Sequence, residues 1–307
     1  MIVCCGEALI DMLPRTSEQG EPAFAPYAGG AVFNTAIALG RLGAPVEFFS
    51  GLSSDLFGNQ IRDVLAKSNV ATSYAVVSAR PTTLAFVRLN NGSATYTFYD
   101  ENTAGRMLSE GDLPAIGDNV QAMLFGAISL IPEPCGNAYE ALMRREHFSR
   151  VMMLDPNIRP GFIQDRDKHA SRIRRMMAMA DIVKLSDDDL EWFGEAGSHD
   201  DIARRWLSLG PKLVVITGGE KGATGYTRAD KVAVPSRRIA VVDTVGAGDT
   251  FNAGLLASLH EQKLLSKDAL LSLSADAVEK ALSLGAQAAA VTVSRAGANP
   301  PWRHELV

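Results

Sequence analysis

The chain has 307 residues, of which 47% are hydrophobic, and a formal net charge of −5. This length can bury a large core without disulfides, and the mild acidity predicts neither a nucleic-acid partner nor a membrane partner. The amino terminus is apolar but has no basic leader, so we expect no signal peptide. Three cysteines, two of them adjacent, fit no zinc spacing and no disulfide framework, and they indicate reduced thiols in a cytoplasmic protein.

Apolar strand patterns alternate with helical patterns along most of the chain. Continuous apolar strands of this kind are typical of a parallel sheet that helices cover on both faces. The sequence therefore predicts an α/β fold with a mainly parallel central sheet. We expect strands at 2–5, 46–50, 121–125, 151–155, 182–184 and 213–217, and helices at 31–42, 56–65, about 133–147, 167–179, 187–208, 248–260 and 266–290.

One region, residues 72–99, breaks this alternation and reads as strands joined by short turns. Its Asn90-Asn91-Gly92 tripeptide is a hairpin signal between β-rich runs. Residues 13–27 are also punctuated by Pro, Gly and Ser, and they run into a glycine pair. We expect these two stretches to form a small β lid, with an antiparallel extension of the main sheet as the alternative. The strands expected in the first region lie at 74–77, 83–89 and 94–99.

The strongest motif, VDTVGAGDTFNAG, includes the end of an expected strand at 239–242. Gly246, Ala247 and Gly248 carry no bulky side chains, so their amides can converge on an anion at a helix N-terminus. Asp249 follows within the first helical turn. A carboxylate beside an anion hole suits removal of a proton from a hydroxyl while a phosphoryl group is bound. Plain helix capping by an aspartate is the alternative.

A second motif, AGGAVFNTA, occupies residues 28–36. Gly29 and Gly30 let the backbone come close to a ligand, and Asn34 offers a donor and an acceptor to a hydroxyl-rich molecule. A capped helix start is again the alternative. The dinucleotide fingerprint G-x-G-x-x-G is absent from this motif, which argues against an NAD-dependent dehydrogenase.

A third motif, VVITGGEKG at 214–222, is a strand that ends in a glycine-rich corner and precedes a hairpin pattern at 223–234. It could approach nucleotide phosphates, but it lacks the P-loop signature, and a plain turn is the alternative. Polar residues also follow two other expected strands: Glu7 and Asp11 after the first, and Asp155, Asn157 and Arg159 near the middle of the chain. Parallel sheets place ligand groups at such strand ends.

Together these motifs resemble the ribokinase/PfkB carbohydrate kinase family over essentially the whole chain. Their order and separation agree with the family: the glycine pair, then Asp-x-Asn-x-Arg, then Thr-x-Gly-x-x-Gly, then Gly-Ala-Gly-Asp. The resemblance implies a three-layer α/β/α kinase domain over 1–307, with a lid formed by about 12–28 and 72–102. It also implies a small sugar and ATP as substrates, with Mg²⁺ and a monovalent cation such as K⁺ as cofactors.

The resemblance assigns roles to individual residues. Ser186 and Asp189 stand where the family often has an Asn-x-x-Glu pair that organises Mg²⁺, and Gly285 stands where relatives have an adenine-side Asn. The remaining implied roles are as follows: Asp249 is the catalytic base and Gly246, Ala247 and Gly248 the anion hole; Asp11, Gly29, Gly30 and Asn34 bind the sugar, with Arg159 close to substrate or phosphate; Lys184, Thr217, Gly219 and Gly222 lie on the nucleotide side; Asp243 and the Val245 carbonyl hold the monovalent cation.

Among subfamilies, the segments GEALID, TFY and DPNIRP look most like bacterial fructokinases. The nearest rival is 2-keto-3-deoxygluconate kinase, whose carboxylate substrate needs a basic residue from the lid. Here Asp100 offers an acid, which favours a neutral sugar. A non-catalytic sugar sensor is a further alternative, although a sensor does not need the base at Asp249. An exposed lid sheet leaves edges and an apolar face to cover, so we expect a homodimer through the lid.

Overall fold

A computed structural model describes residues 1–90 and 93–306. Within this part of the chain, nine strands form a central sheet in the order β15-β14-β13-β12-β11-β10-β1-β4-β6. All neighbours pair in parallel except β14 and β15, which form the expected antiparallel hairpin at one edge. The strands are β1 (Ile2–Cys5), β4 (Val46–Phe49), β6 (Val70–Ala71), β10 (Ala122–Gly126), β11 (Val151–Asp155), β12 (Ile182–Ser186), β13 (Leu213–Thr217), β14 (Ala223–Tyr226) and β15 (Lys231–Val234).

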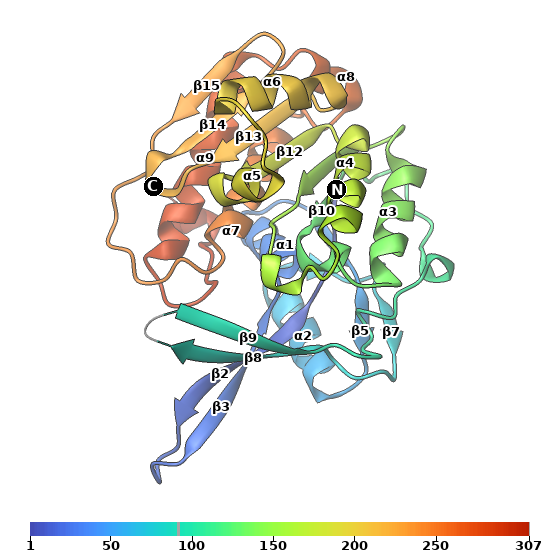
Figure 1. The fold of residues 1–307 in the computed structure, drawn as a ribbon, viewed down its shortest axis with the longest axis vertical. Helices are drawn as coiled ribbons and strands as arrows, with labels where there is room; N and C mark the ends of the chain where they lie inside the picture. Colours follow the sequence, from blue (N-terminus) through green and yellow to red (C-terminus); the bar gives the residue numbers. More distant parts are fainter. Residues whose placement is uncertain (91–92, 307) are drawn as a thin grey trace.

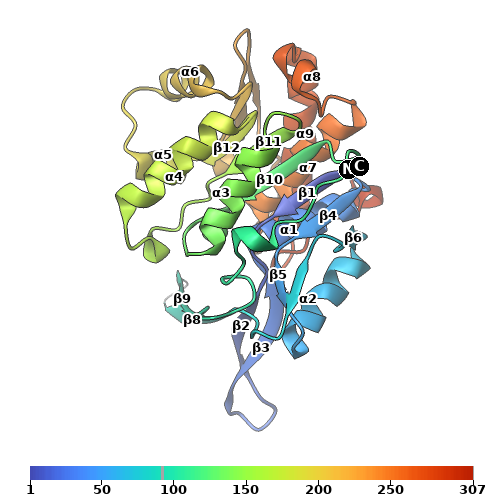
Figure 2. The ribbon, with the colours of Figure 1, turned by 90° about the vertical axis from the view of Figure 1, so that its right-hand side faces the viewer.

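Helices cover both faces of this sheet, so the predicted three-layer α/β/α fold is confirmed (Figures 1 and 2). Side chains alternate between two buried hydrophobic clusters: Ile2 and Cys4 belong to one, Val3 and Cys5 to the other. This explains why each strand reads as continuously apolar. One face carries α1 (Ala31–Arg41), α2 (Leu56–Lys67), α7 (Ala247–Glu261), α8 (Lys267–Leu271) and α9 (Ala275–Val293); the other carries α3 (Cys135–Glu146), α4 (Arg166–Met179), α5 (Asp187–Phe193) and α6 (His199–Leu209).

A separate four-stranded sheet, which we call the lid sheet, projects from one end of the main body (Figure 1). It is not an extension of the central sheet. The hairpin residues Asn91 and Gly92 lie outside the described residues. The lid sheet has the order β3-β2-β8-β9, with β2 (Leu9–Thr16), β3 (Pro22–Gly29), β8 (Leu84–Asn90) and β9 (Ser93–Tyr99).

Some expected elements differ in the structure. The strand expected at 74–77 is β7 (Val76–Ser78), which pairs with β5 (Gly51–Ser53) in a two-stranded sheet of its own. It stays outside the lid sheet because its backbone follows the end of β4, where the Val76 amide donates to the Ser50 carbonyl at 2.9 Å.

The prediction of a strand at 239–242 is wrong. These residues lie beyond the edge strand β15, and the Val242 and Asp243 amides instead donate to the Val293 carbonyl at the end of α9. The β-branched side chains of this segment are typical of a strand, which explains the prediction. Val242 is 64% exposed, however, and does not pack on a sheet.

Two long helices of the sequence prediction are each divided. The stretch 187–208 breaks into α5 and α6, because Gly194 takes a left-handed conformation and Ser198 caps the second helix. The stretch 266–290 breaks into α8 and α9, where Ser274 accepts from the Ala277 amide. Among the described helices, none combines the length and hydrophobicity needed to cross a bilayer. The short 3₁₀ helices are η1 (Glu110–Asp112), η2 (Ala127–Leu130), η3 (Pro160–Phe162), η4 (Gly219–Lys221) and η5 (Arg303–Glu305).

Candidate active site

The N-terminus of α7 forms the centre of the candidate site. Gly246 caps the helix with φ 78°, a left-handed conformation that glycine adopts without strain. Ala247 and Gly248 open the helix, and Asp249 follows in its first turn. The Asp249 side chain is directed inward, since the residue is only 7% exposed. The motif therefore places a buried carboxylate at the positive, N-terminal end of the α7 helix dipole.

Asp249 joins the two sequence motifs that lie farthest apart. The Asn34 amide donates to Asp249 Oδ2 at 2.9 Å, and the Thr35 hydroxyl lies 3.1 Å from the Asp249 carbonyl. These contacts link the first turns of α1 and α7. The structure thus brings the expected base and the expected sugar-binding Asn together at one point.

Burial dominates the electrostatics of Asp249. Desolvation raises the pKa of this carboxyl to about 7, and the nearby Asp155 charge acts in the same direction. The Asn34 hydrogen bond and the Lys184 and Arg159 charges oppose this rise. A carboxylate with such a pKa can accept a proton near neutral pH, as a general base must.

The predicted anion hole is only partly free. The Ala247 amide already donates to the Thr244 carbonyl at 3.3 Å. First-turn amides such as that of Gly248 have no acceptor within their own helix. A Cβ built on Gly248 would lie 3.2 Å from Lys184 Nζ, so an ammonium group sits directly against this turn. Lys184 therefore adds positive charge to the place where the sequence predicted an anion.

Lys184 is held by a buried polar network behind the turn at 246–249, which we call the catalytic corner. Its Nζ lies 3.2 Å from Asp155 Oδ2, and the Asn252 amide donates to the same oxygen at 2.6 Å. Burial disfavours the charged ammonium, but the Asp155 carboxylate outweighs it and raises the pKa of Lys184. The sequence analysis gave Asn252 no role, although its position three residues after Asp249 places it on the same side of α7.

The glycine pair packs directly on acidic residues. A Cβ on Gly29 would lie 2.3 Å from Asp11 Oδ2, so only glycine leaves room for that carboxylate. Burial raises the pKa of Asp11 to about 6. Gly30 has φ 113°, and a Cβ there would lie 2.9 Å from the Glu7 carbonyl. Gly29 thus packs on Asp11 and Gly30 on Glu7, and the sugar-binding roles of Asp11 and the two glycines remain predictions.

Glu7 is a site residue that the sequence analysis mentioned only as a strand-end acid. Its Oε1 accepts from the Ala31 amide at 2.8 Å, and its Oε2 accepts from the Ser129 amide at 3.3 Å. Burial raises the pKa of Glu7 to about 7, and the Asp249 charge adds to the rise. Glu7 therefore ties the start of α1 to η2, and it is close enough to Asp249 for the two charges to interact.

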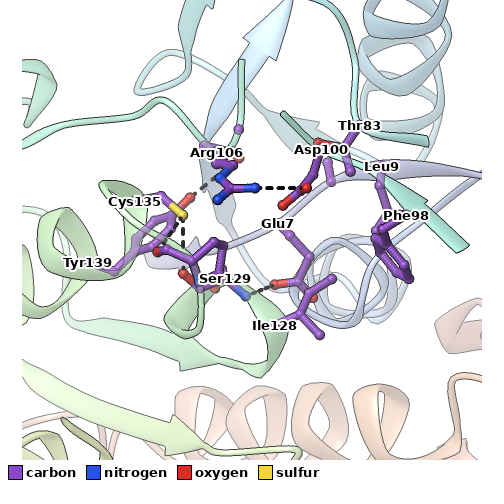
Figure 3. Close-up of a pocket in the computed structure, with 14 residues that line it drawn as sticks. Glu7, Leu9, Thr83, Phe98, Asp100, Arg106, Ile128, Ser129, Cys135 and Tyr139 are labelled. Carbon is purple, nitrogen blue, oxygen red and sulfur yellow. Dashed lines mark hydrogen bonds and ion pairs between the residues drawn. The ribbon is translucent and has the colours of Figure 1, made fainter. Parts of the chain in front are cut away.

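Glu7 also lines a cavity of about 50 Å³ beneath the lid sheet (Figure 3). The lid sheet contributes Leu9 and Phe98, and Arg106 closes another side. Asp100 does not stand alone there, because Arg106 Nη1 pairs with it at 2.9 Å. The expectation that Asp100 repels a carboxylate substrate is thereby weakened, since its charge is compensated.

The expected nucleotide-side residues lie along the carboxyl ends of β12 and β13. Thr217 ends β13 opposite Ser186, and its hydroxyl donates to the Leu185 carbonyl at 3.2 Å. Gly219 and Gly222 form the following turn, with φ 54° and 89°. The structure places these residues on the same sheet edge as Lys184. Their contact with a nucleotide remains a prediction.

Gly285 lies where α9 crosses α7. A Cβ on Gly254 of α7 would lie 2.6 Å from the Gly285 Cα of α9, and a Cβ on Gly285 would lie 2.9 Å from the Phe251 carbonyl. The absence of an Asn at this position is therefore explained by close packing of α7 against α9.

The residues expected to hold cations already have partners. Asp189 Oδ2 accepts from the Ser186 amide and hydroxyl, and Oδ1 accepts from the Ile158 amide at 2.6 Å. Asp243 accepts from the Val245 amide at 3.0 Å and the Gly297 amide at 2.9 Å. Among the described residues, no group of three or more acidic, His or Cys side chains is arranged to hold a metal. The metal roles of Asp189, Asp243 and Val245 therefore remain predictions.

Comparison with known proteins identifies the family. Residues 1–305 match the family described as "pfkB family carbohydrate kinase". The chain belongs to this family. It is therefore a phosphotransferase that acts on a sugar hydroxyl.

Relatives of this carbohydrate kinase include a protein named fructokinase from Rhizobium leguminosarum bv. trifolii. The two are 61% identical over 278 residues, which cover 91% of this chain and 85% of the relative. A fructokinase from Xylella fastidiosa, solved with bound ATP, superposes with a TM-score of 0.88 at 30% identity, covering 97% and 93% of the two chains. An aminoimidazole riboside kinase from Salmonella enterica gives 0.82 at 26% identity, covering 97% and 94%.

Proposed function

We propose that this carbohydrate kinase acts in the cytoplasm, where it transfers the γ-phosphoryl group of ATP to a primary hydroxyl of fructose. The observation that carries the proposal is the buried Asp249 carboxylate, which Asn34 holds beside the N-terminus of α7. The 61% identity to a fructokinase supports the choice of sugar, and the ATP-bound fructokinase fold supports the choice of donor. The buried free cysteines agree with a reducing compartment.

In the proposed mechanism, Asp249 accepts the proton of the sugar hydroxyl while the hydroxyl oxygen attacks the γ-phosphorus. The new P–O bond forms as the bond to the β-phosphate oxygen breaks, and ADP leaves. Asn34 fixes the carboxylate through its 2.9 Å hydrogen bond. Lys184 and the Gly248 amide stabilise the charge that spreads over the phosphoryl oxygens.

ATP-dependent kinases use Mg²⁺, which neutralises phosphate charge when bound. Asp189 does not fit as a direct ligand, because it is only 3% exposed and its oxygens already accept three hydrogen bonds, two from Ser186 and one from Ile158. Mg²⁺ usually keeps several waters and is bound through few carboxylates plus substrate phosphates. We therefore propose that Asp189 would act on Mg²⁺ through metal-bound water. A K⁺ ion would contact the 243–245 loop through the Val245 carbonyl.

The lid sheet is proposed to cover the sugar. Cross-strand pairing puts Asp11 opposite Ala85, and Ala85 opposite Phe98, so these three side chains share one face of the sheet. This face holds the sugar-binding Asp11 and the cavity-lining Phe98. A sheet that closes over the sugar excludes water, which would otherwise consume ATP.

The opposite face of the lid sheet, which we call the outer lid face, is proposed to mediate a homodimer. It presents an aromatic row in which the Phe24 and Phe86 rings lie 5.0 Å apart and the Phe86 and Tyr99 rings 5.5 Å apart. Phe24 is 46% exposed and Tyr99 61% exposed. Association of two such faces would bury this apolar surface.

A panel of sugars in a coupled ADP-release assay tests the substrate. We expect fructose to give the highest kcat/KM, above ribose, adenosine and 2-keto-3-deoxygluconate. The Arg106–Asp100 pair makes the last of these the serious rival, because Arg106 could receive a carboxylate. A preference for 2-keto-3-deoxygluconate would overturn the choice of fructose, and loss of ADP release with every sugar would overturn the kinase mechanism.

A further inference from the structure

Two buried oxygen atoms behind the catalytic corner accept no hydrogen bond from any described residue. They are Asp155 Oδ1 and Asn252 Oδ1. Asp155 is 3% exposed and Asn252 is 2% exposed. Buried acceptors are almost always paired, so each of these atoms requires a donor.

The orientation of the Asn252 amide is fixed by its neighbour. Its Nδ2 donates to Asp155 Oδ2 at 2.6 Å. A flipped amide would place its oxygen against the carboxylate, where two acceptors would repel each other. Asp155 Oδ2 also faces Lys184 Nζ at 3.2 Å. The donors present thus all converge on one carboxylate oxygen, and the two unpaired atoms are both acceptors.

Both residues line one small cavity, and Asp249 lines it as well. Its other walls include Val32, Thr35 and Asn157. The cavity has a volume of about 10 Å³, which is room for a single water molecule. A hydrated magnesium ion is too large for it. Lys184 already compensates the Asp155 charge, so a neutral occupant suffices.

We propose that this cavity binds one ordered water molecule, which donates its two hydrogen bonds to Asp155 Oδ1 and Asn252 Oδ1. A water is the smallest neutral molecule that satisfies two acceptors at once. It completes the shell of hydrogen bonds around Asp155. Through Asp155 it holds the Lys184 ammonium against Gly248, beside the catalytic base. The water and Asn252 are thus positioning elements that act through Asp155 and Lys184.

A crystal structure of the whole protein, at a resolution that shows ordered water, tests the site directly. We expect one density peak within hydrogen-bonding distance of both oxygens. A second crystal soaked in a rubidium salt separates water from a monovalent cation, because rubidium scatters anomalously. An absent peak, or an anomalous peak in the cavity, would overturn the proposal.

Filling the cavity tests its effect on the reaction. Val32→Ile adds one methyl group to an apolar wall and changes no polar side chain. Val46→Ile is the matched control, because Val46 is equally buried but starts β4, at the opposite end of the strands from the site. Both variants are expected to keep the melting temperature within a few degrees.

For V32I we expect the water peak to disappear and kcat to fall by roughly tenfold or more, because small displacements of charged groups next to reacting atoms are costly. The KM for fructose should change little, since Asp11 and Asn34 are untouched. V46I should keep both the peak and the wild-type kcat. If V32I loses the peak but keeps the wild-type kcat, the water has no positioning role. This outcome would leave the proposed kinase activity intact, so the two proposals fail separately.

Discussion

The catalytic corner and the lid sheet are built in opposite ways. The corner is short in sequence, with Gly246, Gly248 and Asp249 inside one motif, and its carboxylate is 7% exposed. The lid sheet draws on two distant segments, and Tyr99 at the end of one of its strands is 61% exposed. The proposed chemistry at the corner depends on the burial of its carboxylate. The stability of the outer lid face in water depends instead on the partner surface that covers it.

This difference predicts where a substitution acts. A charge removed from the corner changes a pKa or a barrier, because the low dielectric of a buried site strengthens each electrostatic interaction. A charge added to the outer lid face meets water and mainly changes association. Variants of the corner should therefore change turnover more than variants of the outer lid face do.

Replacement of the base should have the largest effect. Asp249→Asn keeps the shape of the side chain but cannot accept a proton, so we expect kcat to fall by roughly 10²–10⁴-fold while fructose and ATP still bind. Single-turnover kinetics and calorimetric binding would measure the two quantities. The control is Asp268→Asn, an exposed acid in the first turn of α8. Near-normal turnover of D249N would remove Asp249 as the base.

A methyl group at the glycine corner should impair sugar binding next. Gly29→Ala places a Cβ 2.3 Å from Asp11 Oδ2, so the carboxylate must move away. We expect the KM for fructose to rise by roughly tenfold, which corresponds to the loss of about one hydrogen bond. The change in kcat should be smaller. Gly111→Ala is the control, because a Cβ there makes only an ordinary contact at 3.7 Å. An unchanged KM in G29A would separate Asp11 from the sugar.

The pH dependence of kcat should report the coupling between Glu7 and Asp249. Burial raises the pKa of each carboxyl to about 7, so the base is lost as pH falls through this value and activity rises with pH across it. Glu7→Gln removes a nearby negative charge, which lowers the pKa of Asp249 and moves the acid limb to lower pH.

The other charges that face Asp249, on Asp155, Lys184 and Arg159, stay in place in this variant. Glu47→Gln is the matched control: Glu47 is also buried and accepts from the Ser73 amide, but it lies on β4. Its acid limb should coincide with that of the wild type. A shift to higher pH in E7Q would contradict the coupling.

Charges on the outer lid face should change association with the least effect on turnover per subunit. In the double variant Phe24→Glu/Tyr99→Glu we expect monomers in light scattering where the wild type forms dimers. Exposed substitutions usually alter stability by less than about 0.5 kcal/mol, so folding should persist. Phe148→Glu is the control, because Phe148 is 81% exposed away from the lid sheet. A wild-type protein that is monomeric would end the dimer proposal.

Much of the fold and site was predictable because the signals are local. Apolar runs such as Ile2–Cys5 and Leu213–Thr217 coincide with strands of the structure, since strands buried on both faces need continuous apolar sequence. The turn before Asp249 and the helix after it could also be predicted, because the small residues and the first-turn acid occupy neighbouring positions. The strand expected at 239–242 failed because composition cannot reveal whether a neighbouring strand exists.

The alternation of strands and helices, the glycine turns and the choice of Asp249 as the candidate base all follow from local sequence patterns. Folding alone creates the 2.9 Å contact between Asn34 and Asp249, the ion pair that compensates Asp100, and the raised pKa values of Glu7 and Asp249. These features depend on the distance between segments far apart in the chain and on the exclusion of water from between them. Neither quantity is encoded in the spacing of a local motif.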